Sequence, residues 1–324
     1  MPHSHAHSHG RGHGHGHGHG NAHGHGPPPN RRPAALRRAW LFVAGADAAA
    51  QAAALDARPD VIVPDLEDFT PPPLRPRGRE MILGLLEKAR KRGIVAAVRV
   101  NPLAAEGRND LAVVIQARPD AVLLPKTVAQ EQVVELDRAI TDHERRLAIP
   151  TGSTEIVPNI ETAGGLVAMA GIVRASRRVT ACLLASEDLA TDLGAERTPE
   201  AGELAYARSR FLVECVAAGV VAIDAPYTFS DVEGARAETL RSRRLGYRAK
   251  SAVAPEHVAA VTEVLTPDPG EVARARRLVE AFDAARAAGR DRIELDGALV
   301  ELPTYLTAKR LISRAEELTA FPVH

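Results

Sequence analysis

Acidic residues follow two neighbouring apolar runs of this sequence, at the points where strands would end. Glu161 comes directly after "TEIVPNI", and Asp188 closes "VTACLLASED". Two carboxylates without a histidine or cysteine partner suit a hard divalent cation such as Mg²⁺, which keeps other positions for water and substrate. Such an ion would polarise a carbonyl or hydroxyl oxygen and stabilise a developing oxyanion. We therefore predict that Glu161 and Asp188 hold Mg²⁺.

Other apolar runs also end on polar groups, which are Glu67, Asp68, Arg99, Asn101, Lys126 and Glu187. The planar guanidinium of Arg99 suits a substrate carboxylate, and an ion pair with Glu67 is compatible with that role. Lys126 could be a Schiff-base nucleophile, but surrounding carboxylates favour a charge-balancing role. Taken singly, each acid could instead cap the following helix or pair with an arginine.

The elements that would carry these side chains alternate between apolar runs and helix-like stretches. The eight runs are 39–45, 60–67, 94–101, 120–126, 154–161, 179–188, 219–226 and 247–255. Helical spacing of apolar residues favours helices such as 129–146 and 199–218. This alternation predicts a parallel sheet and a (β/α)₈ TIM barrel over 37–265, with a doubly wound open sheet as the alternative. In such a barrel all strands end at one face, which gathers the polar groups into one site.

The last part of the chain, 266–324, predicts a small lid of helix, hairpin and helix. Its hairpin would turn at Asp296-Gly297, a dipeptide typical of two-residue turns. This segment is too small to fold alone, so we expect it to pack on the barrel or on a neighbouring subunit. At the other end, 1–36 forms a His/Gly-rich arm and a Pro-rich spacer, which we expect to be disordered and which could bind metal ions loosely.

Composition argues against several classes of function. Lys plus Arg equals Asp plus Glu at 41 each, and this balance argues against a general nucleic-acid or membrane-surface binder. No apolar run is long enough to span a membrane. The cysteines Cys182 and Cys215 fit buried reduced thiols, which favours the cytoplasm. A serine hydrolase is weakly supported, because only His143, His257 and His324 lie outside the N-terminal arm.

Between residues 37 and 312 the chain resembles the HpcH/HpaI aldolase/citrate lyase family, in its citrate lyase beta-subunit branch. The resemblance rests on "RRAWLFVAG", "PDLEDFTPPPLRPRGR", "VRVN", "LLPK", "PNIETAGGL", "SEDLATDLG", "AIDAPYTFSDVEG" and "DGALVELP", in this order. It implies a TIM barrel that binds Mg²⁺, forms a homotrimer or hexamer, and cleaves or forms carbon–carbon bonds of 3-hydroxyacyl thioesters such as malyl-, citramalyl- or citryl-CoA.

The resemblance also implies residue roles. Glu161 and Asp188 match the metal ligands, and Arg99 matches the carboxylate-binding arginine. Arg38 matches another substrate-binding arginine, and Glu67 and Asp68 match the acids that order metal-bound waters and nearby loops. The predicted substrate-binding residues are therefore these three and Arg99, to which we add Lys126 from its place among the carboxylates. Asp296 matches a catalytic acid/base on the C-terminal lid, often supplied by the neighbouring subunit.

These roles predict a Mg²⁺-dependent lyase that joins a 2-oxo acid and an acyl-CoA by reversible Claisen or aldol chemistry. The chain departs from the family at Ala185, Ala249 and Ala254, where the family has Gly, Gly and His. These departures keep open an aldolase that acts on a substrate without coenzyme A. A non-catalytic subunit and a thioesterase that hydrolyses the product are further alternatives.

Overall fold

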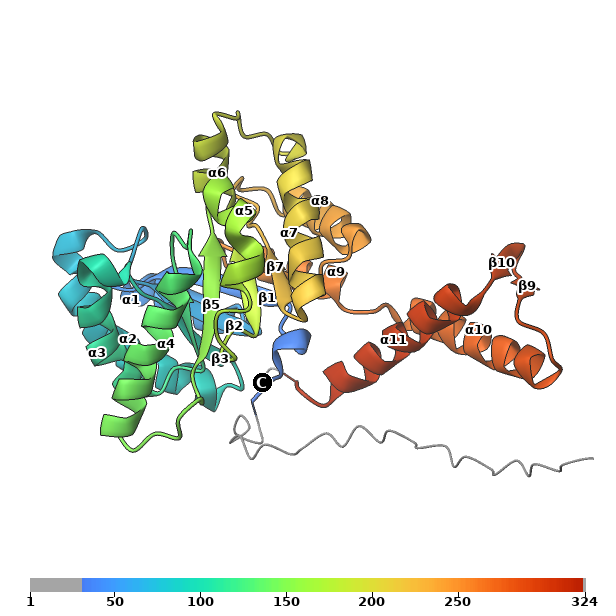
Figure 1. The fold of residues 1–324 in the computed structure, drawn as a ribbon, viewed down its shortest axis with the longest axis horizontal. Helices are drawn as coiled ribbons and strands as arrows, with labels where there is room; N and C mark the ends of the chain where they lie inside the picture. Colours follow the sequence, from blue (N-terminus) through green and yellow to red (C-terminus); the bar gives the residue numbers. More distant parts are fainter. Residues whose placement is uncertain (1–30, 323–324) are drawn as a thin grey trace, which may run out of the picture.

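Eight parallel strands close into a barrel in the computed structural model, which describes residues 31–322 (Figure 1). The strands follow one another around the barrel in chain order, so the predicted TIM barrel is confirmed and the open sheet is wrong. They are β1 Ala39–Ala44, β2 Val61–Asp65, β3 Val95–Arg99, β4 Ala121–Leu124, β5 Glu155–Ile160, β6 Ala181–Leu184, β7 Val221–Asp224 and β8 Ala249–Ala252.

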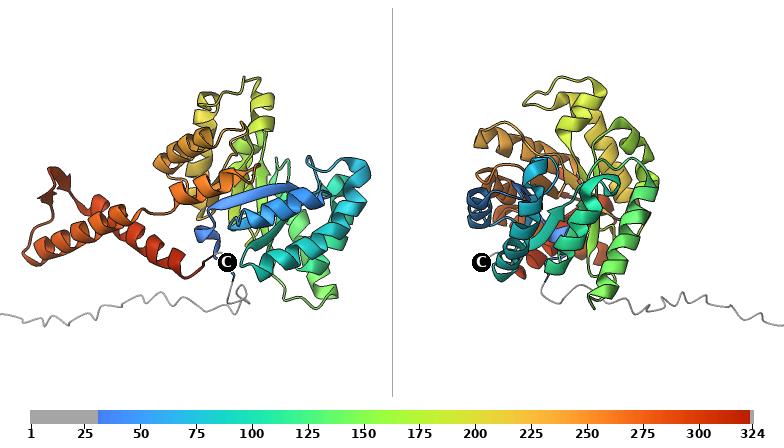
Figure 2. Two further views of the ribbon diagram at one scale, coloured as in Figure 1. Left: turned by 180° about the vertical axis from the view of Figure 1, so that it is seen from behind. Right: turned by 90° about the vertical axis from the view of Figure 1, so that its left-hand side faces the viewer.

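Helices surround this barrel on its outside (Figure 2). They are α1 Ala48–Asp56, α2 Arg75–Lys91, α3 Arg108–Val114, α4 Gln130–Arg146, α5 Ala163–Ile172, α6 Ser186–Leu193, α7 Ala205–Ala218, α8 Val232–Leu245 and α9 His257–Leu265. The helix predicted over 129–146 is present. The helix predicted over 199–218 begins only at Ala205. Ala201 has a left-handed backbone conformation, with φ 53°, so the α-helix cannot extend back to residue 199.

Side chains of each strand alternate between the barrel interior and the layer under the helices. The interior is filled by residues such as Trp40, Val63 and Val157, with a larger apolar cluster between the strands and the helices. On β5, Val157 faces inward, so the alternation directs Asn159 and Glu161 to the inside as well. The pattern thus places polar side chains on top of an apolar interior.

A buried group of charges lies between the last two strands and the helices α7 and α8. Arg208 donates two hydrogen bonds to Asp224, at 2.9 and 2.6 Å. The Lys250 ammonium lies 2.9 Å from Asp224 and 2.7 Å from Glu238. Two cations therefore balance two carboxylates, as buried charges require. Lys250 thus faces the helix layer, away from the barrel interior.

Arginines from the start of the chain close the amino-terminal end of the barrel. Arg31 and Arg37 both pair with Glu155 at the start of β5, at 2.7 and 2.6 Å. Arg38 pairs with Asp60, which precedes β2, at 2.8 Å. Residues 31–36, which we assigned to the arm, thus contact the barrel, whereas 1–30 lie outside the described residues. Within 31–322 no helix is long and apolar enough to cross a membrane.

The C-terminal segment forms the predicted helix, hairpin and helix. Its elements are α10 Pro269–Ala287, β9 Ile293–Leu295, β10 Ala298–Val300 and α11 Leu302–Thr319. Asp268 caps α10 reciprocally with Glu271. Phe282, Val300 and Tyr305 form a small core of its own. The segment extends from the barrel as an arm with the hairpin at its tip (Figures 1 and 2).

Candidate active site

Four charged side chains that were predicted separately meet at the carboxyl-terminal end of the barrel. The Lys126 ammonium lies 2.6 Å from Glu67 and 3.5 Å from Asp68. Arg99 Nη1 lies 3.2 Å from Glu67, and Arg99 Nη2 lies 3.6 Å from Asp68. The strong ion pair with Glu67 raises the pKa of Lys126 against the opposing effect of burial, so this amine stays charged. That favours charge balance over Schiff-base chemistry for Lys126.

Arg99 is held in place from three sides. Its Nε and Nη2 donate to the two carboxylate oxygens of Asp65, at 2.8 and 2.6 Å. Its guanidinium lies over the rings of Phe42 and Phe69, with centroids at 5.3 and 5.9 Å. Asp65 also accepts from the backbone N–H groups of Glu67 and Phe69. The two hydrogen bonds to Asp65 and the two aromatic rings fix the guanidinium so that Nη1 points at Glu67 and Glu161.

Glu161 is fully buried, and no other side chain of the described residues hydrogen-bonds either of its oxygens. Its nearest cation is Arg99 Nη1, at 3.9 Å from Oε1. Burial raises its pKa to about 8; Arg99 opposes this shift, while the charges of Glu67 and Asp188 add to it. A buried carboxylate without a side-chain hydrogen bond is costly, and a bound cation would remove that cost.

Asp188 supplies a second carboxylate near Glu161, whose pKa it raises. It lies exposed in the first turn of α6, and forms no ion pair within 31–322. No group of three or more His, Cys, Asp or Glu side chains in that range could hold a metal ion. Two oxygen ligands with space beside them fit Mg²⁺, which keeps several waters, better than a closed zinc site.

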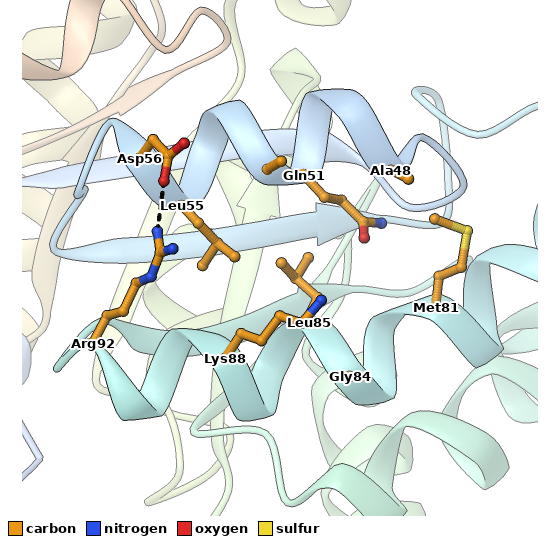
Figure 3. Close-up of a pocket in the computed structure, with 10 residues that line it drawn as sticks. Ala48, Gln51, Leu55, Asp56, Met81, Gly84, Leu85, Lys88 and Arg92 are labelled. Atoms are coloured by element: carbon orange, nitrogen blue, oxygen red, sulfur yellow. Dashed lines mark hydrogen bonds and ion pairs between the residues drawn. The ribbon is translucent and has the colours of Figure 1, made fainter.

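A cavity of ≈180 Å³ opens beside these groups. It is lined by Phe42, Asp68, Phe69, Arg99, Leu183, Ala185, Ser186, Glu187, Asp188, Pro226, Thr228, Ser251 and Val253. A larger groove of ≈430 Å³ between α1 and α2 holds one ion pair, Asp56 with Arg92, and lies outside the barrel (Figure 3). Of these two, the first combines an apolar floor with converging charges of both signs, which is typical of an active site.

Several residues of this site were not singled out from the sequence. Phe42 and Phe69 look like ordinary core positions, and Asp65 acts through Arg99, which is far away in sequence. Asn159 is fully buried on the inner face of β5, and neither its amide oxygen nor its nitrogen has a partner within the described chain. The signal that could have revealed Asn159 is its position two residues before Glu161, where strand alternation directs both to the same side.

Two predicted site residues lie elsewhere. Arg38 precedes β1 and is bound by Asp60 and Thr266 at the amino-terminal end of the barrel, so it does not meet the other site residues. Asp296 lies in the hairpin at the tip of the arm, with 74% of its side chain exposed. The hairpin is far from the mouth of the barrel of the same chain (Figure 1). Of the alanine departures, Ala185 lines the cavity, whereas Ala249 is buried in the lower interior core and cannot narrow the mouth.

Comparison with known proteins assigns the family. Residues 38–255 match the model of the HpcH/HpaI aldolase/citrate lyase family. Citrate lyase subunit beta of Haemophilus influenzae is 33% identical over 87% of this chain and 97% of its own. A (3S)-malyl-CoA thioesterase of Cereibacter sphaeroides is 29% identical over 88% of this chain and 96% of its own.

A solved structure agrees with this assignment. It is the citrate lyase beta subunit of Mycobacterium tuberculosis in complex with oxaloacetate and magnesium, with 25% identity and a TM-score of 0.57 over 72% of this chain and 98% of that one. The chain therefore belongs to the HpcH/HpaI aldolase/citrate lyase family, in its citrate lyase beta-subunit branch, and is a carbon–carbon lyase.

Proposed function

We propose that this protein is a Mg²⁺-dependent lyase that cleaves or forms a 3-hydroxyacyl-CoA thioester of the malyl-, citramalyl- or citryl-CoA type. The observation that carries the proposal is the buried Glu161 carboxylate, which lacks a side-chain partner and lies beside Asp188 and Arg99 at the mouth of the barrel. The Mycobacterium tuberculosis relative, whose structure contains magnesium and oxaloacetate, supports both the ion and a 2-oxo acid as ligand.

In this proposal Glu161 and Asp188 would hold the ion, whose positive charge would polarise a carbonyl. Arg99 Nη1, the guanidinium nitrogen that Asp65 leaves free, binds the carboxylate of the 2-oxo acid. Glu67 and Asp68 would accept hydrogen bonds from bound waters, and Lys126 pairs with both acids and holds them in place. The polar groups thus orient the 2-oxo acid before the second substrate arrives.

Asp296 acts as the general base of the synthesis direction. It removes the alpha proton of the acyl thioester, and the resulting enolate forms the new carbon–carbon bond to the carbonyl carbon of the 2-oxo acid. The electron pair of the carbonyl bond moves to its oxygen, which takes up a proton from water and becomes the hydroxyl group of the product. Cleavage is the reverse, with the proton returned from Asp296 to the alpha carbon. Because Asp296 ends the arm, it reaches a site only if the arm of one chain lies over the barrel of another.

A homo-oligomer follows from this requirement, and the family resemblance favours a trimer or hexamer. Leu299, Leu302 and Leu306 on the hairpin and α11 have exposed fractions of 59%, 46% and 41%. Exposed apolar side chains gathered on a projecting arm are typical of a surface that another chain covers. The two buried free thiols, Cys182 and Cys215, support a cytoplasmic location.

Thioester hydrolysis is a second candidate, because the Cereibacter sphaeroides relative is a malyl-CoA thioesterase. Purified protein is therefore incubated with Mg²⁺ and malyl-, citramalyl- or citryl-CoA, with free 2-oxo acid and free thiol measured in parallel. A lyase releases the 2-oxo acid and keeps the thiol bound in acetyl-CoA, whereas hydrolysis releases the thiol.

The controls are EDTA and Glu161→Ala, both of which should abolish turnover. A protein that turns over none of the thioesters would contradict the proposal. It would leave an aldolase acting on a free acid, or a subunit without activity.

A further inference from the structure

A second cavity, of ≈340 Å³, lies where the arm joins the amino-terminal end of the barrel. Its walls come from the end of α8, the approach to β8, the segment before α10 and one side of α11. The lining residues are Arg243, Arg248, Leu265, Pro267, Thr307, Arg310, Leu311 and Arg314. Four of the eight are arginines and none is acidic. The cavity is therefore strongly basic and separate from the candidate active site.

The basic charge of this cavity is only partly balanced. Arg243 forms an ion pair with Glu271. Arg248 Nη1 donates to backbone carbonyls of Arg243 and Tyr247, at 3.1 and 2.7 Å, and not to a carboxylate. Arg314 likewise donates to the carbonyls of Ala35 and Arg248, at 2.6 and 3.2 Å. The backbone thus holds these two guanidinium groups in place, but no carboxylate hydrogen-bonds to them to neutralise their charge.

Guanidinium nitrogens of Arg314 and Arg310 lack partners among the described residues, whereas the Thr307 hydroxyl donates to the carbonyl of Pro303. Arg314 Nε is buried and has no hydrogen-bond acceptor among residues 31–322. Arg310, one turn earlier on α11, forms neither a hydrogen bond nor an ion pair within that range. Burial and the neighbouring charges of Arg248 and Arg38 lower the pKa of Arg314 to about 10, and the opposing effects of Asp60 and Glu317 do not offset this. An anion in the cavity would relieve this repulsion.

We propose that this cavity binds a small molecule that carries a phosphate or polyphosphate group. Three guanidinium groups without a carboxylate partner, Arg248, Arg310 and Arg314, match an anion of more than one charge, and their planar forks match phosphate oxygens. Leu265, Pro267 and Leu311 provide an apolar wall for an organic portion. The volume lies in the range of small-molecule sites. The ligand would join α11 to the barrel, and the inference does not rest on the proposed lyase activity.

The test is calorimetric titration of the full chain with inorganic pyrophosphate, in EDTA so that no metal bridges the anion. Arg310→Gln is the lead variant, because Arg310 is exposed and its removal breaks no contact of the described chain. We expect Arg310→Gln and Arg248→Gln each to weaken binding about tenfold, the effect of losing one charge-assisted contact. Arg145→Gln removes an exposed arginine from α4 and serves as the matched control with unchanged affinity.

Titration with ADP distinguishes an organic phosphate from an inorganic one. Tighter binding of ADP than of pyrophosphate, lost in Arg310→Gln, assigns an organic phosphate, whereas tighter pyrophosphate binding with the same loss assigns an inorganic anion. Absence of pyrophosphate binding, or equal binding in Arg310→Gln, Arg248→Gln and Arg145→Gln, would overturn the proposal. So would a change of oligomer size in Arg310→Gln without a change in pyrophosphate affinity, which would make the cavity a contact with another chain.

Discussion

Asp65 holds Arg99 at two points, with Nε 2.8 Å from one carboxylate oxygen and Nη2 2.6 Å from the other. Neighbouring strands bring them together, since Asp65 on β2 is the register partner of Arg99 on β3. The fork fixes the plane of the guanidinium and leaves Nη1 as the nitrogen available to a substrate. Asp65 is thus a positioning residue for the arginine that we propose to bind the 2-oxo acid.

Replacing Asp65 by Asn should therefore lower kcat/KM on the active thioester by about 100-fold, since misorientation of a binding group costs on this order. The asparagine keeps the shape of the side chain and one acceptor oxygen, which can serve only one of the backbone N–H groups of Glu67 and Phe69, so circular dichroism must first show that the variant folds. Arg99→Lys should cause a similar loss, because it keeps the charge but not the fork. Steady-state kinetics on both variants check this, and wild-type kcat/KM in Asp65→Asn would rule out the positioning role.

Magnesium should stabilise the protein through Glu161. At 100 times its dissociation constant Mg²⁺ should raise the free energy of unfolding by about 2.7 kcal/mol. Glu161→Gln should lose this effect and, in EDTA, be at least as stable as wild type, because glutamine buries no charge. Urea unfolding with and without Mg²⁺ measures both. Glu187→Gln, which alters an acid paired with Arg197, is the control that keeps the Mg²⁺ effect.

Asp296 and Glu161 should complement each other between chains. Asp296→Asn and Glu161→Gln should each be inactive alone, while Asp296→Asn keeps the stabilisation by Mg²⁺. Oligomers reassembled from an equal mixture should regain roughly one quarter of wild-type activity, because a working site needs Glu161 from its own chain and Asp296 from a neighbour. Failure of the mixture to regain activity, despite confirmed mixed oligomers, would exclude a site shared in this way.

Asp224 should make stability depend on pH below pH 4. Burial opposes its ionisation, but Lys250 and Arg208 outweigh burial and lower its pKa to about 2 from 3.8. A lowered carboxyl pKa stabilises the folded state above the unfolded pKa, and this contribution, about 2 kcal/mol, is lost as the pH falls from 3.8 towards 2.

Urea unfolding of wild type and Asp224→Asn between pH 5 and pH 2 isolates this contribution. At pH 5 the variant should be about 3–5 kcal/mol less stable, because it leaves Arg208 and Lys250 short of one carboxylate. The difference should shrink by about 2 kcal/mol towards the acid end. The matched control is Asp56→Asn, at an exposed ion pair with Arg92, for which the difference should stay small throughout. A pH-independent difference for Asp224→Asn would contradict the assignment.

The barrel itself could be predicted from the sequence because each buried parallel strand leaves a short apolar run bounded by polar loops. The face that gathers Glu67, Arg99 and Lys126 followed from this, since parallel strands in a barrel end together. Arg38 was expected at the site from the family resemblance alone. Because it precedes β1, the same rule places it at the opposite end of the barrel, where it pairs with Asp60.

Partnerships across the barrel wall could not be predicted. Lys250 stands in a predicted strand next to the departure at Ala249, and only the packed structure shows that it neutralises Asp224 and Glu238 from a different strand and helix. The interruption at Ala201 was equally hidden, because alanine favours helix and only the local backbone overrides that preference. The distance of Asp296 from its own barrel depends on the direction of α10, which no local pattern encodes.

The single tryptophan, Trp40, is fully buried inside the barrel and lies outside the C-terminal arm. Its emission will therefore report opening of the barrel alone, whereas far-ultraviolet circular dichroism will also register melting of α10 and α11. If the arm detaches and unfolds before the barrel, the two optical transitions will separate. The protein thus carries a built-in probe that distinguishes loss of the projecting helices from loss of the catalytic scaffold.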